Sequence, residues 1–296
     1  MSRTEWYCGP HLYIKRSDLI KLEKTGKFVG ECKQDGYWCA LYVDNNGPRS
    51  HKFESRTGNN FDGADLMNLR KVDMAKIGAG TILIGELEAG TQAANIKFER
   101  IGFRRIWLHD IVMCRGKDLR KLRVIDRQKL LRTVIWPLLP DRTKIQLPLI
   151  EQTRTNFVEF YDRTLAKGDE GMVLKRWDVH GWPSRSNGKS DEWFRIKPKH
   201  TVDYVVMGPE RTKTSGSLTA QLGLYVNGQL TPCLTYQLPE MTLLANGRLK
   251  EEGRVVQMIG YEVHRSGAVR SAQFDRWRPD KSPEMCTGDI TRVAEI

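Results

Sequence analysis

The sequence predicts an α+β protein of two domains: twisted antiparallel sheets with helices over residues 1–202, then a small antiparallel β-barrel over residues 203–296. Three observations lead to this prediction. Strand-like runs alternate with two amphipathic helical segments before residue 200, and only short strand-like runs and turns follow it. The charge changes at the same place, because residues 1–200 hold 37 Lys or Arg against 25 Asp or Glu, whereas residues 201–296 hold 11 of each.

The elements of the first domain follow from local patterns. Strands are expected at residues 28–33, 37–43, 81–89, 105–113, 171–177 and 192–198. One helix is expected at 126–139, capped by Asp126 and ending near Pro137, with an apolar face of Leu130, Leu131, Val134 and Ile135. A second is expected at 155–168, capped by Thr155 and stopped by Gly168, with Phe157, Phe160, Tyr161 and Leu165 in the core.

The second domain reads as strands alone. A run at 203–208 opens it, and three further stretches at 216–230, 231–238 and 253–263 are strand-like. Turn signals separate them, including Asn227-Gly228 and Asn246-Gly247. About a hundred residues organised in this way are typical of a small closed barrel.

Composition excludes several classes of protein. The 296 residues are 40% hydrophobic and 28% charged, which are globular values. No apolar run is long enough for a transmembrane helix, and the N-terminal residues lack the apolar core of a signal peptide. Six scattered cysteines form no C-x-x-C pair, which predicts reduced thiols in the cytoplasm and no structural zinc site. The net charge of +12 favours a polyanionic partner, most simply a nucleic acid.

The candidate chemistry begins at Lys33, in the run GECKQDGYW at residues 30–38. A lysine in a half-buried strand loses hydration, which favours its neutral form, and a neutral amine is a nucleophile. The pattern K-x-D-G therefore predicts a nucleophilic lysine followed by a turn. A plain hairpin turn at Asp35-Gly36 is the alternative, and the motif by itself does not separate the two.

Further motifs follow Lys33 in a fixed order: Ser55-Arg56-Thr57, Gly85-Glu86-Leu87, His109-Asp110, EGMVLK at 170–175, WFRIK at 193–197, and Arg278-Pro279-Asp280-Lys281. This ordered set, from about residue 28 to 285, resembles the covalent nucleotidyltransferase superfamily. Specifically, it is similar to the small ATP-dependent DNA ligases of viruses, phages and some bacteria. The strength of the resemblance lies in order and spacing, because each piece alone also occurs as a solvated strand face or a loop.

The resemblance implies an adenylation domain followed by an OB-fold, and a reaction of three steps. Lys33 would attack the α-phosphate of ATP, AMP would move to the 5′-phosphate of a nick, and the 3′-hydroxyl would then expel AMP. The cofactors would be ATP and Mg²⁺, with Mn²⁺ as a substitute. Glu31 would meet the adenine, Arg56 the ribose and the 5′-phosphate, and Glu86 the ribose. Glu170 would hold the metal, with Glu86 as a second candidate ligand.

The remaining candidate residues are cations and one imidazole. Lys175 lies in the ligase-like EGMVLK and is expected in the nucleotide site, as is His109, which stands where the family often stacks Phe or Tyr on adenine. Arg195 and Lys197 would face the α-phosphate from one side of a strand. The resemblance places Arg278 and Lys281 on a mobile OB-fold, where they would orient pyrophosphate when that domain closes by bending near residues 200–204.

Some positions depart from the family pattern, and other functions stay open. Trp38 stands where the first motif usually has arginine; we expect it to pack in the core, with Arg49 as a possible replacement cation. The alternatives are an mRNA-capping guanylyltransferase that uses GTP, an RNA ligase, and a non-catalytic OB-fold nucleic-acid-binding protein. Because only 32 residues precede Lys33, we expect nicked double-stranded DNA to be recognised by the two catalytic domains. We also expect a monomer.

Overall fold

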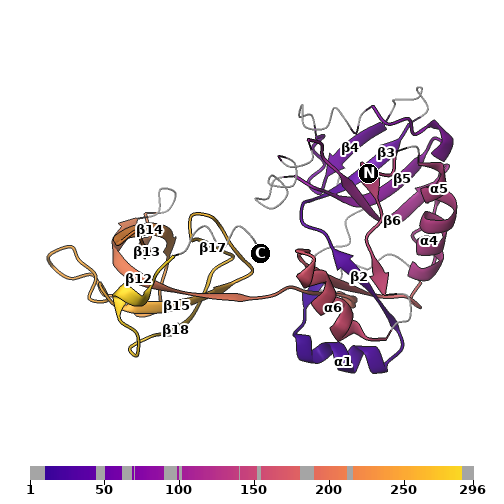
Figure 1. Ribbon diagram of the computed structural model, residues 1–296. Helices are drawn as coiled ribbons and strands as arrows, with labels where there is room; N and C mark the ends of the chain where they lie inside the picture. Colours follow the sequence, from indigo (N-terminus) through magenta and orange to yellow (C-terminus); the bar gives the residue numbers. More distant parts are fainter. Residues whose placement is uncertain are drawn as a thin grey trace. The chain divides into compact units, whose positions relative to one another are not determined.

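The computed structural model describes residues 11–44, 51–61, 69, 71–89, 99, 102–139, 141–151, 155–180, 190–211 and 216–288. The chain forms two compact units, Met1–Ile196 and Lys197–Ile296 (Figure 1). The boundary expected from the sequence, between residues 202 and 203, lies slightly further along, inside β12 (His200–Arg211). No helix among the described residues has both the length and the apolar character needed to span a membrane.

The first sheet of the N-terminal unit brings together strands that are far apart in the sequence. Its strand order is β1 (His11–Tyr13), β11 (Ser190–Ile196), β10 (Gly171–Arg176), β2 (Phe28–Lys33) and β9 (Ile150–Glu151). The β1–β11 pair is parallel and the other pairs are antiparallel. Helices α1 (Arg16–Lys24) and α6 (Phe157–Ala166) lie side by side along this sheet (Figure 1). One core cluster joins the helices to one face of the sheet: Leu19, Phe28, Cys32, Phe157, Phe160, Tyr161, Met172, Leu174 and Ile196.

The second sheet of this unit carries the larger core. Its order is β4 (His51–Ser55), β3 (Tyr37–Val43), β5 (Thr81–Leu87), β6 (Ile106–Cys114) and β7 (Lys117–Asp118), and β8 (Ile145–Gln146) pairs with β6 in parallel. A short 3₁₀ helix, η2 (Ala75–Ile77), precedes β5. Alternate residues of β3 face opposite sides, since Cys39, Leu41 and Val43 join the main core and Ala40 joins a smaller cluster on the other face.

The helix expected at 126–139 is three consecutive helical pieces: α4 (Val124–Leu130), the π-helical η3 (Leu131–Ile135) and α5 (Trp136–Leu138). The wider π turn precedes Pro137, whose ring would clash with the Thr133 carbonyl in a regular α-helix. The predicted cap was wrong. Arg123 is the N-cap, and Asp126 lies inside the first turn, where it accepts a hydrogen bond of 2.8 Å from Arg123 Nε.

The predicted apolar faces are confirmed with one exception. Leu131 and Ile135 are buried and Leu130 packs against the same core, but Val134 is 48% exposed. In α6, Phe157, Phe160 and Tyr161 are buried, and Leu165 packs against them. Gly168 follows the helix with φ of 78°, as a helix stop requires.

The N-cap of α6 is Asn156, so the prediction of Thr155 was wrong. Asn156 has φ of 61°, in the left-handed region that asparagine tolerates better than threonine because its side chain is not β-branched. The first backbone N–H of the helix, at Phe157, donates to Glu23 Oε2 of α1 at 2.8 Å. A carboxylate at a helix N-terminus is favourable, so α1 supplies a cap for α6 from a distant part of the sequence.

The C-terminal unit is built on an antiparallel sheet in the order β14 (Gln229–Tyr236), β13 (Leu218–Val226), β12, β15 (Val255–Gly260) and β18 (Gln273–Trp277). A two-stranded hairpin pairs β16 (Glu262–Val263) with β17 (Val269–Arg270), and the 3₁₀ helix η5 (Pro283–Met285) follows β18. Asn227 and Gly228 both have positive φ between β13 and β14, which confirms the predicted tight turn. The core side chains of this unit include Tyr204, Leu222, Val256 and Met258.

Candidate functional site

The K-x-D-G segment connects the two sheets of the N-terminal unit. Lys33 ends β2 of the first sheet, and Tyr37 begins β3 of the second. Gly36 lies so close to β5 that a Cβ on it would be 2.0 Å from the Leu87 carbonyl oxygen. The glycine of the motif is therefore required by space, because any side chain would push the turn away from the end of β5.

The strand register places the candidate side chains of the first sheet on one face. Lys33 pairs with Gly171 in the β2–β10 ladder, and Glu31 pairs with Val173. Arg195 of β11 is opposite Val173 on the other side. The alternate residues Cys32, Met172 and Leu174 pack against α1 and α6, so Lys33, Glu31 and Arg195 lie on the opposite face. Gly171 contributes no side chain, which leaves space beside the Lys33 amine.

Lys33 is paired with Glu170, the residue just before β10. The Lys33 ammonium is hydrogen-bonded and ion-paired to Glu170 Oε2, and the two side chains are 17% and 16% exposed. The Glu170 backbone N–H also donates to the Lys33 carbonyl at 3.2 Å. The structure thus brings together the predicted nucleophile and the predicted metal ligand, at a site that solvent still reaches.

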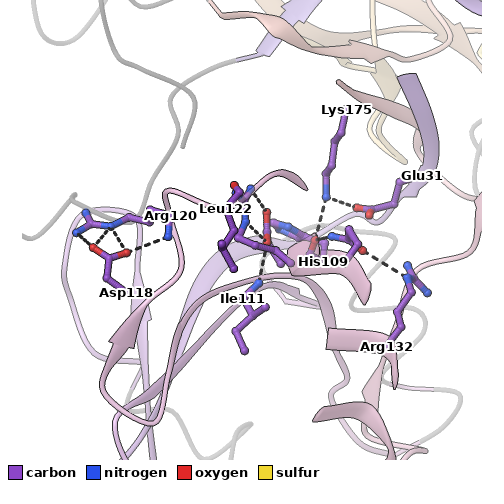
Figure 2. A network of polar contacts seen from close by, with 11 residues as sticks. Glu31, His109, Ile111, Asp118, Arg120, Leu122, Arg132 and Lys175 are labelled. Carbon is purple, nitrogen blue, oxygen red and sulfur yellow. Dashed lines mark hydrogen bonds and ion pairs between the residues drawn. The ribbon is translucent and has the colours of Figure 1, made fainter. Parts of the chain in front are cut away.

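Glu31 forms a second, deeper ion pair. Its Oε1 accepts a hydrogen bond of 2.8 Å from Lys175 Nζ of β10, and both residues are buried. Lys175 Nζ also donates to the His109 carbonyl of β6 at 3.0 Å, which ties the two sheets together. Figure 2 shows this chain of contacts from Glu31 through Lys175 to His109. Lys175 also lies over the ring of Trp193, 4.9 Å from its centroid.

Two residues that sequence reasoning missed complete this network. Gln128 of α4 donates to the His109 carbonyl at 2.5 Å, and its Oε1 accepts from Arg132 Nε at 3.3 Å (Figure 2). Burial raises the pKa of Glu31, although Lys175 and Arg132 act in the opposite direction. Burial also lowers the pKa of Arg132, which Glu31 partly offsets. In the sequence Gln128 and Arg132 look like ordinary polar positions of an amphipathic helix, so no local signal distinguishes them.

The second sheet contributes Glu86, which lies between two tryptophans in the strand register. Trp38 of β3 and Trp107 of β6 are directly opposite it on its two sides. Trp38 packs against the cluster of Ala40, Ile82, Ile84 and Val112, so the prediction that it belongs to the core is confirmed. Burial raises the pKa of the Cys39 thiol, and the negative charge of Glu86 adds to the increase. Arg49, the alternative cation, lies outside the described residues.

Glu88, which sequence reasoning did not single out, holds the strand beside Glu86. It is 2% exposed, and both of its oxygens accept hydrogen bonds from Arg105, at 2.7 and 3.0 Å. Trp107 Nε1 donates to the same carboxylate at 2.9 Å. A buried carboxylate held by a bidentate guanidinium is a rigid anchor, and here it fixes the indole that faces Glu86.

The other candidate residues of the N-terminal unit occupy separate places. Arg56 is exposed in the turn after β4, where Asn59 N–H donates to Ser55 Oγ at 3.0 Å. The Arg195 guanidinium lies over the Tyr13 ring at 3.8 Å. Arg195 Nε is buried and has no hydrogen-bond partner among the described residues.

Three candidate cations belong to the C-terminal unit. Lys197 lies 6.0 Å from the Tyr261 ring centroid. Arg278 and Lys281 both donate to Asp203 Oδ2, at 2.9 and 2.8 Å. Arg278 also binds Asp280, its neighbour in the motif, through Nε and Nη2. This bond to Arg278 is the largest influence on the Asp280 carboxyl and lowers its pKa to about 2.

The carboxylates near Lys33 suit a magnesium ion bound partly by substrate. No group of three or more His, Cys, Asp or Glu side chains is arranged as a metal site within the described ranges. Mg²⁺ commonly binds through one or two protein carboxylates together with substrate phosphates and water. Glu170, partly exposed beside Lys33, fits that mode. The assignment of Glu170 and Glu86 as ligands stays a prediction.

Comparison with known sequences finds DNA ligases. No family model matches the chain. A probable DNA ligase of Streptomyces coelicolor is 32% identical over 205 residues, which cover 59% of this chain and 38% of that protein. A DNA ligase of Thermococcus fumicolans is 27% identical over 217 residues, covering 64% of this chain and 38% of that protein. The chain thus spans about two fifths of the length of these relatives.

Comparison with solved structures finds the same fold. A mycobacterial DNA ligase D complexed with ATP and MES superposes with a TM-score of 0.51 at 20% identity, covering 94% of this chain and 97% of that one. A Lig E DNA ligase superposes with a TM-score of 0.57 at 15% identity, covering 86% and 93%. The predicted resemblance to DNA ligases is confirmed, and the α+β fold is that of these ligase structures.

Proposed function

We propose that this chain is an ATP-dependent DNA ligase that seals nicks in duplex DNA through a covalent lysine–AMP intermediate. The observation that carries the proposal is the Lys33–Glu170 ion pair beside Gly171, on the face of the sheet that also holds Glu31 and Arg195. A nucleophilic amine, a carboxylate and a cation on one sheet face are what nucleotidyl transfer to a lysine requires. The similarity to DNA ligases supports the choice of reaction.

In the first step the Lys33 amine attacks the α-phosphorus of ATP. A P–N bond forms, the bond from that phosphorus to the bridging oxygen breaks, and the electron pair leaves with pyrophosphate. An ammonium has no lone pair, so Lys33 must lose a proton before attack, and Glu170 is the adjacent base. Arg195 would stabilise charge on the α-phosphate, because the strand register places it on the same sheet face as Lys33.

A divalent cation, Mg²⁺ or Mn²⁺, would neutralise phosphate charge when bound. Glu170 would hold it, with Glu86 as the second candidate. Glu31, Lys175 and His109 would line the base end of the nucleotide, where the Gln128 contact keeps the His109 backbone in place.

The second step uses the adenylylated lysine, and the third uses the adenylylated nick. The 5′-phosphate of the nick attacks the phosphorus of the lysine–AMP, which breaks the P–N bond and returns the electron pair to Lys33. The 3′-hydroxyl then attacks the activated 5′-phosphate and expels AMP. We assign residues 1–202 to the adenylation domain and residues 203–296 to an OB-fold domain, because the five-stranded antiparallel sheet and its hairpin resemble that barrel. The partner would be nicked duplex DNA and the enzyme a monomer.

Covalent labelling tests the proposal. The purified chain is first treated with pyrophosphate to remove any bound AMP, and then incubated with Mg²⁺ and α-labelled ATP, or α-labelled GTP in parallel, before a denaturing gel. We expect label from ATP, no label from GTP and none in Lys33→Ala, followed by sealing of a nicked duplex. Label from GTP alone would show a capping-type guanylyltransferase. No label from either nucleotide would contradict the proposal and favour a non-catalytic nucleic-acid-binding protein.

A further inference from the structure

The C-terminal unit contains a carboxylate that gathers the two cations of its last motif. Asp203 lies near the start of β12, and its Oδ2 accepts from Arg278 Nη1 at 2.9 Å and from Lys281 Nζ at 2.8 Å. Arg278 and Lys281 lie in the turn after β18, some 75 residues away in sequence. A single oxygen atom thus contacts both positively charged heads, and Asp280 holds the Arg278 guanidinium through its remaining donors.

Asp203 is itself held in place. Its other oxygen, Oδ1, accepts from Gln257 Nε2 of β15 at 2.9 Å, and Gln257 Oε1 accepts from Arg276 Nε of β18 at 3.1 Å. The Asp203 side chain is 11% exposed, whereas those of Arg278 and Lys281 are 20% exposed. The carboxylate is therefore fixed through both oxygens on three strands of the sheet, and the two cations remain partly open to solvent.

We propose that Asp203 is a positioning residue for adenylylation, which holds Arg278 and Lys281 together so that they engage one polyphosphate leaving group. The inference rests on the proposed function. It goes beyond it because neither the motif order nor the sequence similarity assigns a role to Asp203.

Charge and entropy explain why a carboxylate is useful between two phosphate-binding cations. Guanidinium and ammonium groups repel each other, and a shared counter-ion between them offsets that repulsion. Long cationic side chains also lose rotamer freedom when they bind a ligand, and side chains that are already fixed lose less. A pyrophosphate group that develops negative charge as it leaves would therefore meet a preassembled pair of cations.

The test separates the first chemical step from the last. Single-turnover adenylylation is measured across ATP concentrations, and sealing of a pre-adenylylated nick is measured without ATP. For Asp203→Asn we expect the adenylylation rate at saturating ATP to fall by about tenfold or more, and sealing of the pre-adenylylated nick to change by less than about threefold. Glu262→Gln is the matched control, because Glu262 pairs with Arg270 in the same unit and away from this motif. Its adenylylation rate should stay within about twofold of the unmodified chain.

One further variant keeps the proposal falsifiable if Asp203→Asn folds poorly, and a double variant tests the coupling directly. Gln257→Leu keeps both ion pairs and removes one restraint on Asp203, so it should slow adenylylation by about threefold. Asp203→Asn combined with Lys281→Met should lose less than the product of the two single losses, because the two changes disrupt one arrangement. Equal losses in both steps, an unchanged adenylylation rate or a faster one would each overturn the proposal. An unmodified chain that takes no label from ATP would instead overturn the proposed function.

Discussion

Glu170 holds Lys33 from two directions, through the ion pair between their side chains and through the hydrogen bond from its own backbone N–H to the Lys33 carbonyl. The amine is thus fixed at the end of β2, with Gly171 opposite it in the ladder. A carboxylate in this position acts twice in the proposed reaction. It orients the amine in the free protein, and in the reaction it would take the proton of the amine and hold the metal ion.

Substituting Lys33 should abolish the first step, whereas substituting Glu170 should slow it. Lys33→Ala should take no label from ATP at any metal concentration, because the nucleophile is absent. Glu170→Gln should still form lysine–AMP, but at a rate lower by on the order of a hundredfold, and it should need more Mg²⁺ for half-maximal rate. Rapid-quench adenylylation over a Mg²⁺ titration measures both effects.

The matched control for Glu170→Gln is Glu159→Gln, on the exposed side of α6. That variant should behave as the unmodified chain. A normal rate and metal requirement in Glu170→Gln would show that another group takes the lysine proton and holds the metal.

The buried pair of Glu31 and Lys175 should matter for stability as well as for nucleotide binding. Lys175→Met leaves the buried Glu31 carboxylate without its cationic partner. We expect it to lower the free energy of unfolding by about 3–5 kcal/mol. Adding Glu31→Gln removes that unpaired charge, so the double variant should recover about 1–3 kcal/mol of the free energy of unfolding. Urea unfolding of the single and double variants measures this coupling.

Asp178→Asn breaks a pair with Arg176 that is about one third exposed, and should cost less than about 1 kcal/mol. It serves as the control for the buried pair in the same unit. Strictly additive losses from Glu31→Gln and Lys175→Met would mean that the two residues contribute independently, in spite of their contact.

Local sequence patterns predicted the strands and helices that carry the site better than they predicted which of its side chains contact each other. The strands of Glu31, Lys33 and Glu86 follow from β-propensity and length. Helix α1 was missed, although Asp18 accepts from the backbone N–H of Lys15 at 2.9 Å as a capping residue does. That carboxylate three residues after Lys15 was the available signal.

Pairing between distant strands could not be predicted from periodicity. The β2–β10 ladder sets Lys33 opposite Gly171, and nothing local to either segment specifies that register. For the same reason Gln128, Arg132 and Glu88 were missed, because each acts through a partner in another element. The motif resemblance identified the candidate residues, and the structure adds which of them touch: Lys33 with Glu170, and Glu31 with Lys175. Their assigned roles stay predictions.

Gly36 provides a test of the motif that does not involve a charged group. In Gly36→Ala the new Cβ would overlap the Leu87 carbonyl oxygen, so β5 and the turn must separate. We expect a loss of about 3 kcal/mol in stability and a fall of about a hundredfold in adenylylation, because Lys33 is displaced with the turn.

Gly228→Ala is the control, since Gly228 has φ of 79° but no atom within 4 Å of the added Cβ. It should cost about 1 kcal/mol and leave adenylylation unchanged. Equal behaviour of the two variants would show that the turn tolerates displacement.

Binding to nicked duplex should be governed by phosphate charge. The 12 excess cations all fall within the first 200 residues, so affinity should be independent of DNA sequence and should drop steeply as salt rises. The exposed side chain of Arg56 is the candidate contact to the 5′-phosphate. Arg56→Ala should therefore reduce the slope of log K against log salt by about 0.9, as expected for one phosphate contact.

Arg16 is a matched control, because it is ion-paired with Asp162 between α1 and α6, on the sheet face opposite to Lys33. Arg16→Ala should leave the slope unaltered. If both variants reduced the slope equally, duplex binding would be spread over the surface of the unit and not directed to the face that carries the lysine.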